Sequence, residues 1–248
     1  MCYHKQDKAL KGQLEKYYDA VMRDFEYSPS YYENGFDFKA SPIITAERPK
    51  ELLGYNWGFV PWWVKSEAEA KKLRVQTLNC ISEEMYDKAS YKDSAKEGKR
   101  CLIPATGFFE WRWLDAKGKA KIPYFIHAKN QEIFSIAGLY TSWHDKASGE
   151  ELNTYTVLTT AANPLLTKIH NSKKRMPVIL KKEYEKDWLN ANLTKDDVLA
   201  LCQPLAEGYL DAQTIGKKVG TPAISTDEKN NPDIEKPVEY PELGLLDA

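Results

Sequence analysis

Residues 100–113, RCLIPATGFFEWRW, decide the fold class of this chain. The stretch is rich in aromatic and branched apolar residues, which is typical of short strands. Similar runs lie on both sides of it, separated by turn sequences such as AKGK and KASGE: PIITA (42–46), YNWGFVPWW (55–63), IPYFIHA (122–128), EIFSIAGLY (132–140) and NTYTVLTT (153–160). The sequence therefore predicts a mostly β core between about residues 42 and 160.

Helical patterns flank this core. Apolar residues at three- and four-residue spacing predict an amphipathic helix over residues 10–25. SEAEAKKL (66–73) is expected to be helix or coil, and short helices are expected at KKEYEKDWL (181–189) and TKDDVLALC (194–202), the last with Thr194 as N-cap. From about residue 206 to 248 the chain is rich in Gly, Pro, Asp and Lys, and we expect this tail to wrap the domain. The expected fold class is α+β, in one domain spanning 1–248.

Composition limits the function. The 248 residues are 42% hydrophobic, and 35 basic residues against 36 acidic ones give a net charge of −1, so a nucleic-acid site must be local. No apolar run reaches the roughly 18 residues of a membrane span, and the start, MCYHKQDKAL, lacks the apolar region of a signal peptide, which predicts a cytoplasmic protein with no membrane partner. The four cysteines form no C-x-x-C pair, so we expect free thiols and neither a metal nor another cofactor.

Cys2 directly follows Met1. Removal of Met1 would make Cys2 an N-terminal 1,2-aminothiol, whose α-amine, with a pKa of roughly 7.7 to 8.0, is partly neutral at cell pH. A neutral amine attacks aldehydes to form a Schiff base, and the neighbouring thiol can close on that imine to give a five-membered thiazolidine. For an isolated cysteine, an inert, disordered N-terminus is the commoner interpretation.

Two ionisable side chains are candidates for proton transfer. Strand alternation in GFFEWRW puts Glu110 on the face opposite Trp111, and partial burial there would raise its pKa and suit a proton shuttle. The pattern alone favours the alternative, a solvated carboxylate paired with Arg112. His170, in TKIHNSKKRMPVIL, precedes a basic run and an apolar strand and could exchange protons near neutral pH. Its alternative is a surface histidine.

Three further segments could contact a substrate. Asn79, in QTLNCISEEM, carries an amide that can orient a substrate, although a turn or capping role is as good an interpretation. Trp62 and Trp63 could stack on unpaired bases or wedge into a duplex end if exposed. Core packing is the commoner explanation for both, and Trp57 and Phe59 are expected in the core. Clusters of basic residues usually mark a solvated face but could hold a phosphate backbone. They lie at Lys71, Lys72 and Arg74, at Lys96, Lys99 and Arg100, and at Lys168, Lys173, Lys174 and Arg175.

Together, Cys2, WGFVPWW, Asn79, RCLIPATGFFEWR and IHNSKKRMPVIL resemble the SRAP family, the SOS response-associated peptidases that shield abasic sites in DNA. The resemblance implies a mixed, mainly antiparallel β-barrel-like core flanked by short helices. It implies a monomer that binds single-stranded DNA containing abasic sites, in the cytoplasm or on the nucleoid. It identifies Cys2 as the nucleophile, with Asn79, Glu110 and His170 as the other catalytic residues. The expected DNA contacts are Trp62, Trp63, Lys173, Lys174 and Arg175.

The implied activity is a covalent thiazolidine crosslink between Cys2 and the ring-opened deoxyribose. Two other functions stay open: a cysteine-type peptidase that removes its own N-terminal residue, and a noncovalent single-strand DNA-binding module. An abasic-site lyase activity could accompany the crosslinking. The chain departs from the family at Tyr3 and His4, where a glycine and an arginine are common, and at Ile81, where a second arginine is expected. Four residues, where the family usually has one, separate His170 from the arginine of the R-M-P strand. Lys173 and Lys174 are expected to compensate for the missing arginines.

Overall fold

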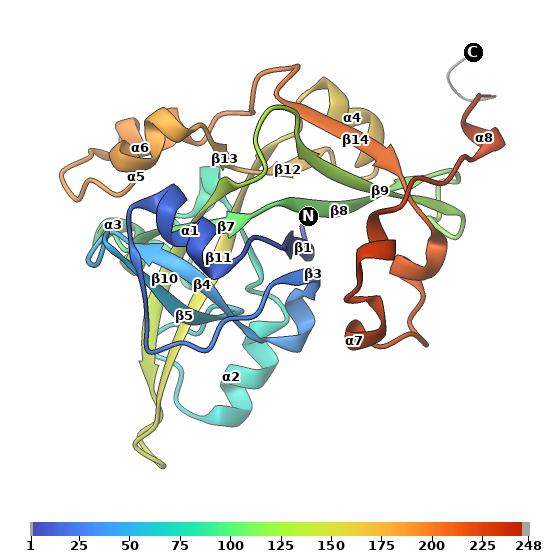
Figure 1. Ribbon diagram of the computed structural model, residues 1–248. Helices are drawn as coiled ribbons and strands as arrows, with labels where there is room; N and C mark the ends of the chain where they lie inside the picture. The colour runs from blue at the N-terminus through green and yellow to red at the C-terminus, as the bar shows by residue number, and fades with distance from the viewer. Residues whose placement is uncertain (1, 245–248) are drawn as a thin grey trace.

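A closed barrel of five strands forms the larger part of the fold in the computed structural model, which describes residues 2–244 (Figure 1). The barrel strands are β4 (Ala40–Thr45), β5 (Glu51–Trp57), β7 (Arg100–Ala105), β10 (Phe134–His144) and β11 (Glu151–Ala161). Antiparallel pairs run in the order β5–β4–β7–β10–β11, and a parallel pairing of β11 with β5 closes the ring. Closure gives these strands partners on both sides, so no barrel edge is open for association with another chain.

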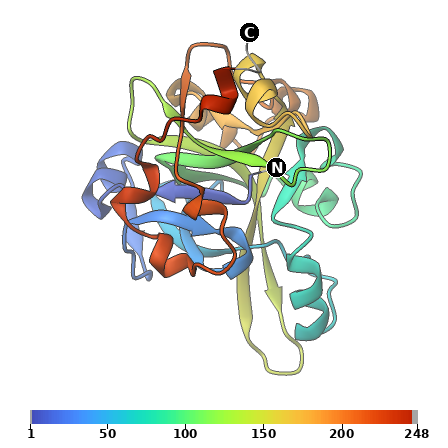
Figure 2. The ribbon, with the colours of Figure 1, turned by 90° about the vertical axis from the view of Figure 1, so that its right-hand side faces the viewer.

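Four short strands extend the barrel sheet: β2 (Val21–Arg23) on β5, β6 (Asn79–Ile81) and β12 (Arg175–Pro177) on β11, and β13 (Ile179–Leu180) on β10. The far ends of β10 and β11 form a hairpin that projects away from the body of the molecule (Figures 1 and 2). Strand β11 therefore pairs along its length with several segments that are distant in sequence.

A second sheet has the strand order β14–β9–β8–β1–β3, formed by Leu210–Thr214, Lys121–Ala128, Gly107–Trp113, His4–Asp7 and Ser30–Asn34. The chain passes from the barrel into this sheet between Ala105 and Gly107. A Cβ atom at Gly107 would lie 2.3 Å from the ring of Phe125, so only glycine fits at this crossing. The N-terminal strand β1 is interior in the sheet, between β8 and β3.

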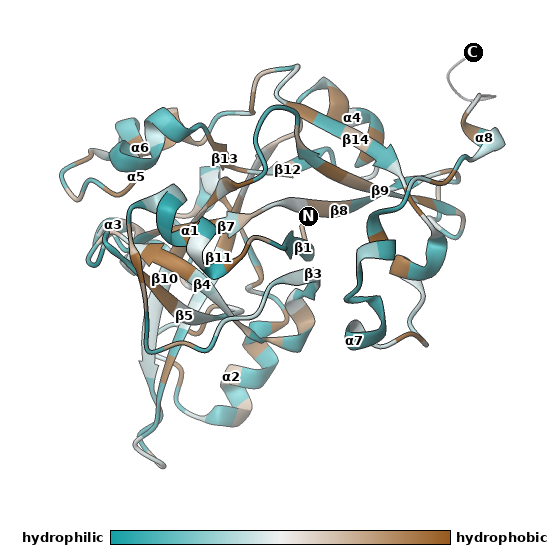
Figure 3. Ribbon diagram, viewed as in Figure 1, coloured by the Kyte–Doolittle hydropathy of each residue, from teal (hydrophilic) through white to brown (hydrophobic). Residues whose placement is uncertain are grey.

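Strand alternation in β8 separates two apolar clusters, as the sequence predicted. Phe108 packs in a cluster that contains Cys2 and Ile126, whereas Phe109 packs with Tyr32 and Phe125. Hydrophobic residues are concentrated in the central strands, and the helices and the hairpin tip are more hydrophilic (Figure 3). Trp57 and Phe59 are buried, as expected.

Short helices flank the sheets: α1 (Lys11–Tyr18), α2 (Glu67–Arg74), α3 (Lys92–Lys96), α4 (Pro164–Ile169), α5 (Glu185–Trp188), α6 (Lys195–Leu201), α7 (Thr226–Lys229) and α8 (Pro241–Gly244). Single 3₁₀ turns are η1 (Gly35–Asp37), η2 (Ser82–Glu84), η3 (Lys182–Tyr184), η4 (Lys217–Gly220) and η5 (Pro232–Glu235). The Thr194 hydroxyl caps α6 by accepting the Asp197 N–H at 3.2 Å. The expected α+β class with a barrel-like core and short helices is confirmed. Within residues 2–244, no helix has the length and apolar character that crossing a membrane demands.

Two expectations were wrong. The first helix ends at Tyr18 and does not reach residue 25, because Asp19 adopts a left-handed conformation (φ 50°) and residues 21–23 pair with β5 instead. The tail after about residue 206 was expected to be loop-rich, but residues Leu210–Thr214 form strand β14, which was not predicted. This strand is short and largely polar, and it pairs with β9.

Candidate active site at the N-terminal strand

Cys2 lies beside strand β8 in the apolar cluster that also holds Trp57 and Tyr155. Its thiol is buried and donates to the His4 carbonyl at 3.7 Å. Burial raises the pKa of the Cys2 thiol to about 12, and the nearby Glu110 charge acts in the same direction. The β1–β8 register pairs Lys5 with Phe108 and Gln6 with Gly107, so the residues before β1 run toward the end of β8 that holds Glu110. Burial and the Glu110 charge also raise the pKa of Tyr3.

Glu110 and His170 meet in the interior. Their side chains are 5% and 7% exposed, and His170 Nδ1 lies 3.9 Å from Glu110 Oε1. Burial raises the pKa of Glu110 to about 7 and lowers the pKa of His170 to about 4. The solvated carboxylate and the surface histidine, which local patterns favoured, are therefore wrong. At neutral pH the carboxyl group populates both of its protonation states, and the imidazole is neutral.

Helix α4 brings these two residues together by packing against β8. The Asn163 side chain caps α4 by accepting the Leu166 N–H at 2.9 Å, and His170 follows the last helical residue. Asn171 then fixes the segment to the end of β8, because its amide accepts the Trp113 N–H at 3.0 Å and donates to the Trp113 carbonyl at 2.9 Å. Sequence analysis missed Asn171, since nothing local distinguishes it from a loop asparagine.

The Asn79 side chain is a buried amide with unmet hydrogen-bonding capacity. The residue is 8% exposed, and neither Oδ1 nor Nδ2 has a hydrogen-bond partner among residues 2–244. Leaving such a group unpaired costs about 1–3 kcal/mol, which a polar ligand would offset. Asn79 pairs through its backbone with Val157, whose side chain belongs to the Cys2 cluster. A simple turn or capping role does not describe this residue.

Arg175 is engaged with a carboxylate. Its Nη1 and Nη2 atoms lie 2.8 and 2.7 Å from the two carboxylate oxygens of Glu83, and Nη2 also donates to the Thr159 carbonyl at 2.6 Å. The neighbouring Lys173 and Lys174 are exposed. Glu83 was not predicted as a partner, because the two residues are far apart in the sequence.

Trp62 and Trp63 lie at the surface between β5 and α2. Their exposed fractions are 65% and 41%, so core packing is wrong for both. The indole N–H of Trp62 donates to Asp93 Oδ2 at 2.9 Å, and that of Trp63 donates to the Ala89 carbonyl at 3.4 Å. Both rings are anchored at one edge and present apolar surface to solvent.

His4 fills the place where the family commonly has an arginine. Its ring stacks on Tyr32 with 5.3 Å between centroids, and its Nδ1 lies 2.9 Å from the Tyr32 hydroxyl. Burial lowers the pKa of His4 to about 3. The side chain is therefore neutral and cannot replace a phosphate-binding cation.

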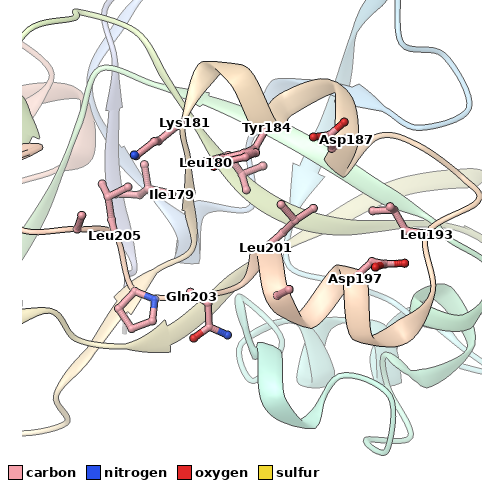
Figure 4. Close-up of a pocket in the computed structure, with 13 residues that line it drawn as sticks. Ile179, Leu180, Lys181, Tyr184, Asp187, Leu193, Asp197, Leu201, Gln203 and Leu205 are labelled. Carbon is pink, nitrogen blue, oxygen red and sulfur yellow. The ribbon is translucent and has the colours of Figure 1, made fainter.

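A pocket of about 520 Å³ lies elsewhere, between β13, α5 and α6 (Figure 4). Residues such as Leu180, Tyr184 and Leu201 line it, and none of the expected site residues does. Ile179 and Leu205 line this pocket and also belong to the apolar cluster that contains Cys2, but Cys2, Glu110 and His170 themselves do not line it.

Comparisons with known proteins identify the family of the chain. The sequence profile described as SOS response associated peptidase (SRAP) matches residues 1–222. The abasic site processing protein YoqW of Bacillus subtilis is 36% identical over 212 residues, which cover 85% of this chain and 89% of that protein. The abasic site processing protein HMCES of Gallus gallus is 31% identical over 74% of this chain and 60% of its own length. A crystal structure of a Bacteroides thetaiotaomicron protein superposes with a TM-score of 0.87 at 35% identity, covering 96% of this chain and all of that one. The chain thus belongs to the SRAP family.

Proposed function

We propose that this protein captures abasic sites in single-stranded DNA by forming a thiazolidine between Cys2 and the ring-opened deoxyribose. The observation that carries the proposal is the burial of Cys2 beside Glu110, which itself lies against His170. The proposed nucleophile comes from the N-terminus. The proposed proton-transfer groups come from β8 and from the end of α4, and they lie near the nucleophile. Relatives that are named abasic site processing proteins support the same substrate.

The chemistry requires a chain that begins at Cys2. In a longer chain the Cys2 nitrogen is an amide, which is not a nucleophile toward aldehydes. Removal of Met1 yields an α-amine whose ordinary pKa is roughly 7.7 to 8.0, so a useful fraction is neutral at pH 7. Amine and thiol then sit on adjacent carbons of one residue.

Ring opening is the first step, because an abasic deoxyribose is mostly a closed hemiacetal. We assign this step to His170. Its Nδ1 carries a proton, since it lies 2.8 Å from the Arg175 carbonyl, which only accepts hydrogen bonds. In the neutral ring Nε2 is then the basic nitrogen. It takes the C1′ hydroxyl proton and returns it to the ring oxygen as the bond between C1′ and that oxygen breaks, which frees the aldehyde.

Imine formation needs a group that both accepts and returns a proton. The pKa of Glu110, raised by burial to about 7, suits both directions at cell pH. The amine attacks C1′, and Glu110 carries the two protons of the nitrogen, one after the other, to the former aldehyde oxygen, which first becomes the carbinolamine hydroxyl and then leaves as water. The thiol then adds to the imine carbon, a C–S bond forms, and the thiol proton passes to the imine nitrogen.

The ring closure protects the strand. A simple imine hydrolyses and promotes β-elimination of the 3′ phosphate, whereas the thiazolidine carbon is saturated and no longer activates that bond. Asn79 would hold the sugar in register through its unpaired amide, a contribution of orientation. The proposed DNA contacts are Trp62, Trp63, Lys173, Lys174 and Arg175. Stacking of bases on the two exposed indoles would contribute to DNA binding whatever the base sequence.

An oligonucleotide with one abasic site tests the proposal. Protein confirmed by mass to begin at Cys2 should gain the oligonucleotide mass minus one water, and the adduct should survive denaturation. Cys2→Ala keeps the amine but lacks the thiol, so it should give an adduct only after reduction of the imine. An undamaged oligonucleotide is the control. Binding of both oligonucleotides without any covalent product would indicate a noncovalent module, and cleavage of a supplied peptide, or loss of an N-terminal residue alone, would indicate a peptidase.

A further inference from the structure

Residues 225–238, here called the C-terminal strap, lie beyond the part of the chain that matches the family profile. The strap holds α7 and η5 and runs beside the N-terminal strands, and Figure 2 shows it crossing in front of them. Figure 1 shows the same segment next to β3. The strap therefore brings the C-terminal part of the chain into contact with β1, the strand that follows Cys2.

The first anchor is Glu235. Its carboxylate accepts the Gln6 side-chain N–H at 2.9 Å and the Lys8 ammonium at 2.8 and 3.1 Å. Gln6 is a buried residue of β1, and the Lys8–Glu235 pair is largely shielded from water. Hydrogen bonds to an ionised group are stronger than neutral ones. Glu235 therefore binds one side chain of β1, Gln6, and one that directly follows the strand, Lys8.

The second anchor joins the strap to β3. Asn230 Oδ1 accepts the backbone N–H of Tyr31 at 2.7 Å, and the Lys229 ammonium lies 5.5 Å from the centre of the Tyr32 ring. The Tyr32 hydroxyl in turn lies 2.9 Å from His4 Nδ1. The side chain of Ile234 packs in the same apolar cluster as Tyr32. The strap thus also contacts Tyr32, which in turn stacks on His4.

A nucleophile at a chain terminus has a positioning problem that these contacts address. Terminal strands fray unless they are tied down, and a misplacement of about 1 Å at a reacting atom can cost on the order of 100-fold in rate. We propose that the C-terminal strap positions the Cys2 nucleophile by fixing β1, with Glu235 as its principal positioning residue. This inference rests on the proposed function.

A matched pair of carboxylates in η5 separates positioning from general stabilisation. Glu235 contacts Gln6 of β1, whereas Asp233 pairs with Lys236, at 2.8 Å on the exposed face of the strap. Changing either residue to Ala removes one carboxylate from the strap. Glu235→Gln is the conservative variant, because its amide oxygen can still accept from Gln6 or Lys8.

The experiment measures three quantities in the full chain beginning at Cys2. They are single-turnover adduct formation at saturating abasic oligonucleotide, affinity for an oligonucleotide with a tetrahydrofuran abasic analogue that cannot react, and amide hydrogen exchange of residues 4–8. Glu235→Ala should slow adduct formation about tenfold, speed exchange in residues 4–8 and leave the affinity within about twofold. Glu235→Gln should recover most of the rate, and Asp233→Ala should behave as wild type.

Each of the other experimental outcomes would contradict a specific part of the proposal. An unchanged rate in Glu235→Ala overturns the positioning role, as does an equal loss in Asp233→Ala. A loss that merely follows the unfolded fraction, measured by thermal unfolding, does the same. If the wild-type protein forms no adduct, the proposed function itself fails and the inference falls with it, which is a different result from adduct formation that ignores Glu235.

Discussion

His170 Nδ1 lies 2.8 Å from the backbone carbonyl oxygen of Arg175, and this contact assigns the proton to Nδ1. The carbonyl belongs to β12, which pairs with β11, so the tautomer of the histidine is fixed by the sheet itself. The side chain of the same Arg175 is held by Glu83. One residue thus orients the proposed base with its backbone while its guanidinium is held by a carboxylate.

Glu110→Gln tests the proton-transfer role. The amide keeps the size of the side chain but cannot exchange a proton, so adduct formation should slow by roughly 10²- to 10⁴-fold. Binding of an undamaged oligonucleotide should not change. Quenched-flow adduct formation and an equilibrium binding titration measure the two effects. A variant with wild-type kinetics would remove Glu110 from the mechanism.

Glu110→Gln should also change how the stability of the folded protein depends on pH. The folded pKa of Glu110, about 7, lies above its ordinary 4.5, because burial disfavours the charged form. The associated stability is fully present below pH 4.5 and is lost as pH rises through 7. Glu110→Gln should therefore gain stability relative to wild type between pH 4.5 and pH 8, on the order of 3 kcal/mol at most. Urea unfolding at the two pH values checks this, and an identical difference at both would contradict it.

His4 should make the protein sensitive to acid. Its folded pKa of about 3 lies below its ordinary 6.5, because burial disfavours the imidazolium. The unfolded chain therefore binds the proton first, and stability is lost as pH falls below 6.5. His4→Phe keeps an aromatic ring against Tyr32 and removes this titration. Between pH 7 and 4.5 the variant should lose less stability than wild type, by as much as about 3 kcal/mol, and parallel losses would show that His4 does not carry the effect.

Glu83→Ala should release the Arg175 guanidinium for a phosphate. Binding of single-stranded DNA should become tighter, and the slope of log affinity against log salt should steepen by about 0.7 for one added phosphate contact. Glu84→Ala is the matched control, because this neighbouring acid pairs with Lys88 at 3.3 Å and not with Arg175. Weaker DNA binding in Glu83→Ala would mean that the ion pair holds Arg175 in its binding position.

Trp62→Ala and Trp63→Ala should each weaken single-strand binding. Stacking of a base on an aromatic side chain contributes about 1–3 kcal/mol. Because both rings are exposed, thermal stability should change little. Tyr184→Ala removes another exposed aromatic ring, on the far pocket, and serves as the control. Fluorescence anisotropy measures the affinities, and equal affinities for all three variants would exclude the stacking platform.

Arginines that are common in the family are missing from this chain. Lys173 and Lys174 are expected to supply positive charge for DNA binding in their place. Lys173→Ala combined with Lys174→Gly should flatten the salt dependence of DNA binding. Glycine is chosen at position 174 because this residue has a φ of 51°, which alanine adopts only with strain. An unaltered salt slope would take both lysines out of the interface.

The local sequence pattern was sufficient to predict those elements whose residues prefer the same secondary structure that they adopt in the fold. The strands around Gly107 and the capped helix after Thr194 fall where the sequence placed them. Residues 21–23 do not, because their spacing suits a helix while pairing with β5 makes them a strand. In β14, four of five positions are not fully buried, so no apolar alternation marks it.

The environment of the proposed site residues does not follow from their local sequence. Burial of Glu110 is produced by the packing of α4, which follows more than fifty residues later, so its local pattern favoured a solvated carboxylate. The same holds for Arg175, whose partner Glu83 is 92 residues away. Sequence similarity named these residues, while only the folded chain shows which of them are in contact.

The position of β1 in the middle of its sheet has a consequence for synthesis on the ribosome. Cys2 is translated before β8 and the α4 segment that pack around it, and the strap follows these segments. At about 5–20 residues per second, many seconds pass between the synthesis of Cys2 and that of α4. During that interval the Cys2 thiol lacks the apolar side chains that cover it in the folded chain, so it becomes buried only after these later segments have been made.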